Sequence, residues 1–149
     1  MNSYLVSSLN LAPAIYERLL AKIPPAKLDE ATAEGRFSPR EVIAHLADWE
    51  PIFLARLHQT LQKPGSTLEI WDENEMAVAH EYSMTEIPEQ FARFREARAA
   101  TFEFVRGLST LDWDSSAVHP ERGNLTVRDQ IGMLLGHDVY HIDQLSEAI

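Results

Sequence analysis

The sequence of 149 residues contains no cysteine. Disulfides, thiolate-bound zinc and cysteine nucleophiles are therefore excluded, and any bound metal must be held by nitrogen and oxygen ligands. Positive charge is also scarce, because 13 lysines and arginines stand against 23 aspartates and glutamates, for a net charge of −10. A chain of this charge repels phosphate backbones, so we expect no nucleic-acid partner.

Long apolar runs are missing as well. No segment approaches the ~20 apolar residues that span a bilayer, so we expect no membrane partner. The opening residues, MNSYLVSSLNLAP, lack the basic and apolar regions of a signal peptide, and we therefore expect a cytoplasmic protein. With 45% hydrophobic residues, a chain of this length can bury one core, which predicts a single domain over residues 1–149.

Apolar side chains recur every three or four residues in four long stretches, which is typical of helices that bury one face. The stretches run from about Val6 to Ile23, from Ser38 past Leu57, from about Pro88 to Arg106, and from Thr126 to Ala148. No stretch shows a sustained alternation of apolar and polar residues, so we predict no sheet. The fold class predicted is all-α.

Two of these stretches begin with a capping box, in which a hydroxyl residue is followed three positions later by an acidic one. The boxes are Ser38-Pro39-Arg40-Glu41 and Thr126-Val127-Arg128-Asp129. Between the second and third stretches lies a long connection, where a short helix is expected to open near Trp71 and end near His80. The sequence thus predicts an antiparallel four-helix bundle with one long connection.

The fourth stretch carries two histidines that share a helix face. His137 and His141 are four residues apart, and Leu134 and Leu145 continue the same apolar stripe. His45 holds a comparable position on the second stretch. If the two helices face each other, three imidazoles meet, which is the ligand set of a catalytic divalent metal site with an open position. The alternative is that they are hydrogen-bonded core histidines.

The remaining histidines, His58, His80 and His119, are interpreted as surface or edge residues. Asp48 and Asp138 are the nearest carboxylates in sequence to the predicted ligands. Asp48 is a candidate to support the histidine three residues before it through a hydrogen bond. Asp138 projects roughly 100° away from the neighbouring imidazole on an ideal helix, so we expect it on a solvated face.

Two other metal-binding architectures fit less well. A ferritin-like di-iron bundle needs Glu-x-x-His pairs, but Glu41 precedes His45 by four residues, and the residue three before His141 is an aspartate. A zinc-protease motif begins at His80-Glu81, but Met84 stands where its second histidine is required.

At the predicted ligands the sequence resembles the DinB-like superfamily of metal-dependent enzymes, which includes the YfiT-type hydrolases. The matching segments are GRFSPREVIAHLADWE over residues 35–50, NLTVRDQI over 124–131 and GHDVYH over 136–141. The resemblance implies a four-helix bundle with one ligand histidine on the second helix and a His-x-x-x-His pair on the fourth. These positions correspond to His45, His137 and His141. Phe37 departs from the tryptophan common in relatives, which changes packing and leaves the ligand set intact.

The resemblance further implies one divalent metal ion, with zinc, nickel, iron and manganese as candidates, a small-molecule substrate and a homodimer. It implies a hydrolase or a small-thiol-dependent S-transferase, in which the metal activates a bound water or a low-molecular-weight thiol. The alternative is a non-catalytic, dimeric metal-binding sensor or stress-response binding protein. An open coordination position beside a pocket favours the enzyme, and a closed four-ligand shell favours the sensor.

Overall fold

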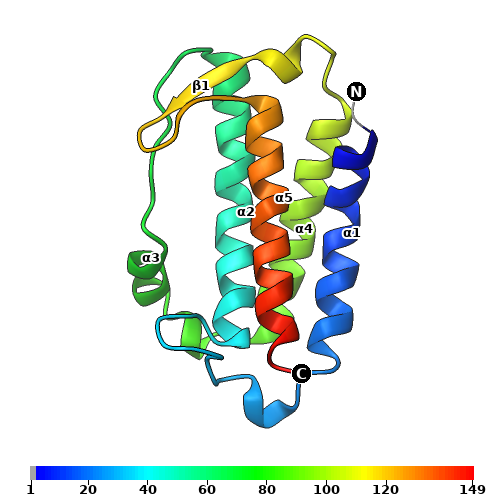
Figure 1. The fold of residues 1–149 in the computed structure, drawn as a ribbon, viewed down its shortest axis with the longest axis vertical. Helices are drawn as coiled ribbons and strands as arrows, with labels where there is room; N and C mark the ends of the chain where they lie inside the picture. Colours follow the sequence, from blue (N-terminus) through cyan, green and yellow to red (C-terminus); the bar gives the residue numbers. More distant parts are fainter. Residues whose placement is uncertain (1–2) are drawn as a thin grey trace.

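The computed structural model describes residues 3–149, in which four long helices pack side by side (Figure 1). A short helix lies in the long connection, so the predicted bundle with its extra short helix is confirmed. The helices are α1 (Ser3–Leu20), α2 (Pro39–Gln62), α3 (Glu73–Ala79), α4 (Ile87–Arg106) and α5 (Val127–Ser146), with single 3₁₀ turns at Pro25–Lys27, Tyr82–Met84 and Asp112–Asp114. No helix in this range is both long and apolar enough to cross a membrane.

The long connection sets the direction of the helices. It carries the chain back along the length of the bundle, so α2 and α4 point the same way, whereas α5 runs antiparallel to α2 (Figure 1). Helices α2 and α4 pack against each other, and both α2 and α1 also contact α5. The connection, with α3, therefore stands beside α2, and residues 63–86 cover a face of the bundle that a tight turn would leave open.

Both predicted capping boxes are present and fix where α2 and α5 begin. The Ser38 hydroxyl accepts a hydrogen bond from the backbone N–H of Glu41, and the Glu41 carboxylate accepts one from the Ser38 N–H at 2.8 Å. Thr126 and Asp129 make the same reciprocal pair. Such a cap contributes about 1 kcal/mol to helix stability.

A two-stranded sheet precedes α5, so the prediction of no sheet is wrong. Strands β1 (Ser116–His119) and β2 (Gly123–Thr126) pair antiparallel, with His119 opposite Gly123. Each strand has four residues, which is too short for the alternation that marks a strand in sequence. Gly123 has a φ of 79°, a backbone conformation that suits glycine at the turn.

The hairpin also holds the start of the long connection. The Leu68 N–H donates to the Val118 carbonyl at 2.8 Å, and the Val118 N–H donates to the Ser66 carbonyl at 2.8 Å. Leu68 is buried. These contacts place the turn of the hairpin over the same side of the bundle as the connection.

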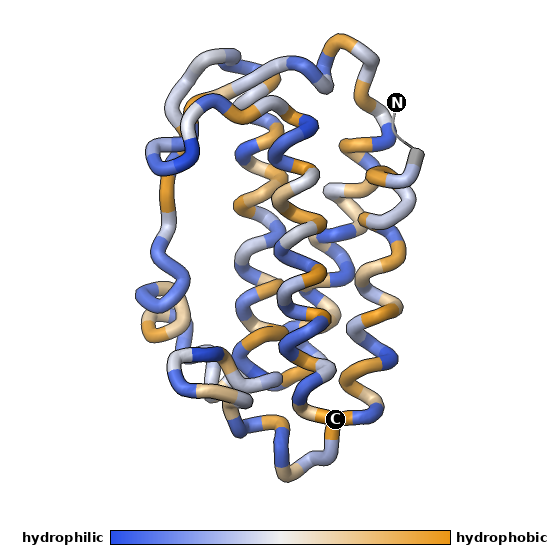
Figure 2. Tube along the Cα trace, in the orientation of Figure 1, coloured by the Kyte–Doolittle hydropathy of each residue, from blue (hydrophilic) through white to orange (hydrophobic). Residues whose placement is uncertain are grey.

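The interior of the bundle consists of two apolar clusters. Apolar residues recur between polar ones on every turn of each long helix, as expected for helices that bury one face (Figure 2). One cluster comprises Val6, Leu9, Phe53, Leu57, Val105, Leu108, Trp113, Val127, Ile131 and Leu134; the other comprises Ala12, Tyr16, Ile23, Val42, Ile43, Leu46, Ala47, Phe94, Leu145 and Ala148. On each helix the two sets occupy successive halves, and a polar layer lies between them.

That polar layer is centred on Arg98, which is 1% exposed. Its guanidinium donates to both carboxylate oxygens of Glu50 at 2.7 and 2.8 Å and to both of Asp138 at 2.7 and 2.9 Å. A further hydrogen bond goes to the Leu9 carbonyl, and the Tyr16 hydroxyl donates to Asp138. Residues from α1, α2, α4 and α5 thus meet at one arginine.

Asp138 is 3% exposed, so the expectation that it lies on a solvated face is wrong. Its projection away from His137 was correctly anticipated, but the face it occupies is turned toward α1 and α4, where Arg98 compensates its charge. Burial alone would lower the pKa of Arg98, but its hydrogen bonds to Glu50 and Asp138 raise that pKa above its usual value. The arginine is therefore charged at neutral pH.

Replacing Arg98 should be strongly destabilising, because it leaves two buried carboxylates without a counter-charge. We expect Arg98→Met to lower the free energy of unfolding by about 3–5 kcal/mol in urea denaturation. Arg106→Met is the matched control, since Arg106 pairs with Glu103 on the exposed surface and should change stability by less than about 1 kcal/mol. Equal losses in the two variants would contradict the role given to the buried network.

Candidate metal centre

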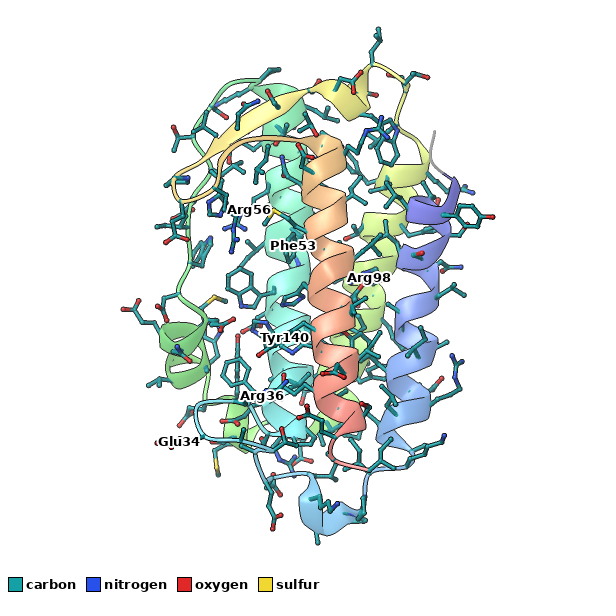
Figure 3. All side chains as sticks on the ribbon, viewed as in Figure 1. Glu34, Arg36, Phe53, Arg56, Arg98 and Tyr140 are labelled. Atoms are coloured by element: carbon teal, nitrogen blue, oxygen red, sulfur yellow. The ribbon has the colours of Figure 1, made fainter. Side chains whose placement is uncertain are left out.

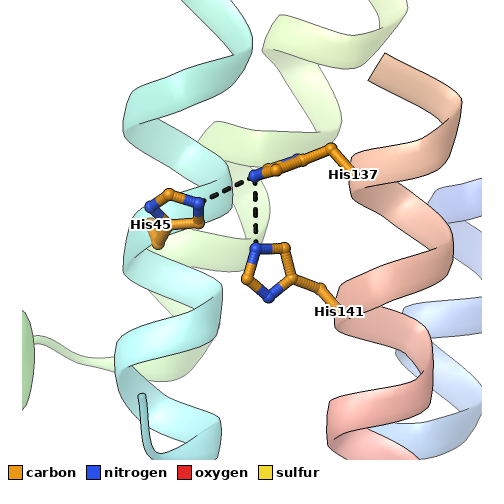
Figure 4. A group of neighbouring side chains, drawn as sticks. All are labelled: His45, His137 and His141. Carbon is orange, nitrogen blue, oxygen red and sulfur yellow. Dashed lines mark hydrogen bonds between the residues drawn. The ribbon is translucent and has the colours of Figure 1, made fainter. Parts of the chain in front are cut away.

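The structure brings together the three histidines singled out in the sequence (Figure 4). His45 projects from α2, and His137 and His141 project from α5. The Nε2 of His137 lies 2.8 Å from the Nε2 of His45 and 3.2 Å from the Nε2 of His141. One ligand atom from each residue lies within 4.8 Å of the others, so the three rings present nitrogen atoms to a common point.

Aromatic side chains surround this cluster. The ring centroid of His45 lies 5.3 Å from that of Phe37 and 5.4 Å from that of Trp49, and the ring of Phe53 lies 5.6 Å from His137. Phe37 thus packs directly on a predicted ligand. These contacts restrict the rotation of the imidazoles and limit their access to water.

Gln144 determines which nitrogen of His141 carries the proton. Its amide N–H donates to the Phe37 carbonyl at 2.7 Å, and a carbonyl can only accept. The Gln144 amide oxygen therefore faces the Nδ1 of His141, at 2.9 Å, and must accept a hydrogen from it. In the neutral ring the Nε2 then carries a lone pair, and this lone pair is directed at the cluster.

All three imidazoles are held in the neutral form that binds metals. Burial, followed by the neighbouring histidines, lowers the pKa of His45 to about 2. Burial and His141 lower the pKa of His137 to about 3, and burial lowers that of His141 to about 4. The Nδ1 atoms of His45 and His137 are buried and have no hydrogen-bond partner within the described part of the chain.

The donor set fits a divalent ion. Metal–imidazole bonds of ~2.0–2.1 Å in a tetrahedral shell separate the nitrogen atoms by roughly 3.3 Å, close to the 2.8 and 3.2 Å observed. Without an ion, the Nε2 of His137 would face two other ring nitrogens at these distances, although one ring nitrogen can share only one proton at a time. No carboxylate between residues 3 and 149 joins the group, so the cluster consists of three histidines. A tetrahedral ion held by them would keep a fourth position for a water or a substrate.

A cavity of about 290 Å³ adjoins the cluster. His45, Trp49 and His137 form the inner wall, and the connection and the hairpin turn form the outer wall. The full lining consists of His45, Trp49, Phe53, Arg56, Ile70, Trp71, Glu73, His119, Glu121, Arg122, Met133 and His137. Small-molecule sites in proteins are of this kind, concave and partly aromatic with a few polar groups.

Several of these cavity residues were not anticipated from the sequence. His119, interpreted as a surface or edge residue, is 5% exposed because the hairpin turns it inward. Glu121 and Arg122 line the cavity from the same turn. Because the hairpin was not predicted, these cavity residues were not predicted either. Gln144 was also overlooked, although its position three residues after His141 places it on the same helix face and could have revealed it.

The other acidic and histidine candidates lie elsewhere. The Asp48 carboxylate contacts the Nδ1 of His80 and, at 3.1 Å, the guanidinium of Arg93. A supporting role of Asp48 toward His45 thus stays a prediction, and no hydrogen bond between the two is seen in the described residues. His58 is exposed, and its ring packs on Phe104 with centroids 4.2 Å apart.

Comparison with known proteins identifies the family. The profile of the DinB superfamily matches residues 8–145, which include all three histidines and the four long helices almost entirely. The chain belongs to the DinB superfamily.

One relative of the chain is a protein of Oceanobacillus iheyensis named "Putative metal-dependent hydrolase OB0782". It is 22% identical over 141 residues, which are 95% of this chain and 81% of the relative. The chain is thus similar to this relative over almost its full length.

Two solved structures share the fold. YfiT from Bacillus subtilis, described as a probable metal-dependent hydrolase with an unusual four-helix bundle topology, superposes with a TM-score of 0.90 at 19% identity, covering 97% of this chain and 83% of YfiT. A mycothiol-dependent maleylpyruvate isomerase superposes with a TM-score of 0.75 at 17% identity, covering 95% of this chain but 59% of the isomerase. At these identities the likeness shows the bundle fold.

We predict that removing one imidazole empties the centre. Protein purified without chelator or affinity tag should contain about one divalent ion per chain by elemental analysis, and His137→Ala should contain none. His58→Ala is the control, because His58 is exposed and lies outside the cluster. Metal content that survives in His137→Ala would show that the ion binds elsewhere.

We also predict that Gln144 tunes metal affinity without touching the ion. Gln144→Leu removes the acceptor that fixes the His141 proton on Nδ1, and such hydrogen bonds are worth about 10–100-fold in metal affinity. Competition with a metal-binding dye should show this weakening. Gln62→Leu, at the exposed end of α2, should leave the affinity unchanged, and equal affinities in both variants would refute the assignment.

Proposed function

We propose that this chain is a metal-dependent enzyme that acts on a small molecule, with His45, His137 and His141 as the metal ligands. The observation that carries the proposal is that the three-histidine cluster, which no carboxylate joins in the described residues, lies at the wall of a 290 Å³ cavity. A purely structural metal site has a closed shell of protein ligands and needs no cavity beside it.

The chemistry of the centre follows from its charge. Three neutral imidazoles leave the full positive charge of the ion uncompensated, and imidazole suits zinc, nickel and iron, with manganese as a further candidate. When bound, such an ion supplies Lewis-acid chemistry that makes a water or a thiol more acidic. The chain itself positions the ligands: Gln144 fixes the His141 tautomer, and Trp49 and Phe53 shield the rings from bulk water.

Hydrolysis is the reaction that the relatives support first. The relative from Oceanobacillus iheyensis is named a "Putative metal-dependent hydrolase" and YfiT is described as a "probable metal-dependent hydrolase", and the chain covers more than four fifths of each. The second candidate is transfer of a small thiol, supported by the likeness to a mycothiol-dependent isomerase. The thiol must come from a separate molecule, because the sequence has no cysteine.

A non-catalytic metal sensor would need neither a cavity nor an open coordination position, so the geometry favours the enzyme.

The homodimer stays a prediction from the family resemblance. A sedimentation experiment at micromolar concentration would test it, because a monomer there would remove it.

An assay panel tests the proposed function. The metal-loaded protein should hydrolyse members of a panel of esters and amides, or should consume electrophiles only when a small thiol is added. Activity should fall to the uncatalysed level in His137→Ala and persist in His58→Ala. A dependence on added thiol distinguishes transfer from hydrolysis.

Activity that is equal in wild type and His137→Ala would come from a contaminant or from another site, and would contradict the proposal. A metal-loaded protein that turns over nothing in the panel, with a fourth protein ligand found on the ion, would favour the sensor instead.

A further inference from the structure

Two arginines are buried among the described residues of this bundle, and they differ in whether a carboxylate compensates their charge. Arg98 is compensated by two carboxylates. Arg56 is 8% exposed and forms no ion pair with any residue between 3 and 149. A buried charge without a counter-charge is costly, so its presence calls for an explanation.

Arg56 is held firmly in the wall of the cavity. It points from α2 toward the long connection (Figure 3), where one terminal nitrogen donates to the Glu69 carbonyl at 2.8 Å. Its guanidinium lies 5.9 Å from the centre of the Trp49 ring, and Trp49 in turn contacts His45. The Nε of Arg56 is buried and has no partner in the described residues. Trp49 therefore separates a fixed, under-compensated cation from the histidine cluster.

The hairpin turn adds a second cation to the same cavity. Arg122 lies in the turn between β1 and β2, lines the cavity and, like Arg56, has no ion pair in residues 3–149. Burial, followed by the charge of Arg122, lowers the pKa of Arg56, and the negative charge of Glu69 offsets only part of this effect. His119, from the same turn, also lines the cavity, and burial together with the two arginines keeps its pKa below the usual value. Arg56 and Arg122 thus both line one cavity.

We propose that Arg56 and Arg122 form a carboxylate-binding subsite, and that the substrate is a small carboxylic acid whose carboxylate sits there while its reacting group faces the histidine cluster. This inference rests on the proposed function for the identity of the reacting end. Guanidinium groups match a carboxylate in a paired geometry, and Trp49, Phe53 and Trp71 suit an apolar or aromatic body between the two ends.

The charge of the cavity favours a monoanion over a phosphate ester. Glu73 and Glu121 line the cavity together with Arg56 and Arg122, so two acidic groups stand near two basic ones. A second negative charge on the ligand would be repelled by these carboxylates. The volume of about 290 Å³ limits the ligand to a small molecule.

A binding experiment on the full chain tests the subsite without any assumption about turnover. Benzoate, benzamide and phenyl phosphate are titrated by calorimetry into the protein as purified, and again after dialysis against a chelator. In the chelated protein, where no metal competes for the carboxylate, benzoate should bind at least about tenfold more tightly than benzamide or phenyl phosphate.

Charge variants locate the binding. Arg56→Gln and Arg122→Gln should each weaken benzoate binding by about 10- to 100-fold and leave benzamide unaffected. Glu121→Gln should tighten benzoate binding, because it removes a repelling charge at the same turn. Arg18→Gln is the matched control, since Arg18 is an exposed arginine on α1 that also lacks an ion pair in the described chain.

If Arg56→Gln fails to fold, the exposed pair Arg122 and Glu121 still decides the question through opposite shifts. Benzoate affinity unchanged in Arg122→Gln, or changed equally in Arg18→Gln, would overturn the subsite. Tighter binding of phenyl phosphate than of benzoate would overturn its assignment to a carboxylate.

The two proposals can fail separately. Benzoate binding that needs both arginines, in a protein with no activity in the assay panel, would confirm the subsite and remove the enzyme. Activity in the assay panel, in a protein whose benzoate affinity is unchanged by Arg122→Gln, would confirm the enzyme and remove the subsite.

Discussion

The buried contact of Arg98 with Glu50 and Asp138 is the constraint on which the geometry of this bundle depends. Apolar packing alone leaves helices free to rotate and slide by small amounts, because many arrangements bury similar areas. An arginine that must satisfy two carboxylates from two other helices admits few arrangements. Asp138 directly follows His137, so fixing Asp138 toward α4 turns His137 toward α2. Glu50 fixes the rotation of α2 in the same way, five residues after His45.

The three-histidine cluster and the outer wall of its cavity come from different parts of the chain. The three histidines belong to α2 and α5, which the capping boxes and the Arg98 network hold in place. The outer wall belongs to the long connection and the hairpin turn, which are tied together by the backbone bonds of Val118. A pair of helices thus supplies the three histidines, and irregular segments supply the outer wall of the cavity, the division of roles that the proposed enzyme would use.

The fold and the histidines that meet in it could be predicted because both depend on local sequence patterns. Helical spacing, two capping boxes and a His-x-x-x-His pair need no knowledge of distant contacts. The hairpin could not be found in this way, because four-residue strands show no period and their pairing depends on the connection. Asp138 was misplaced for a related reason, since the angle of a residue on a helix does not reveal which neighbour lies there. The packing of α1 and the position of Arg98, forty residues away, make that face an interior one.

The central claim is that a divalent ion sits where the Nε2 atoms of His45, His137 and His141 converge. A crystal grown with zinc and measured at the zinc absorption edge tests it most directly. The account predicts one strong anomalous peak per chain, within about 2.0–2.1 Å of all three Nε2 atoms, with the remaining position facing the cavity beside Trp49. A peak at any other site, or a fourth protein side chain closing the shell, would contradict it.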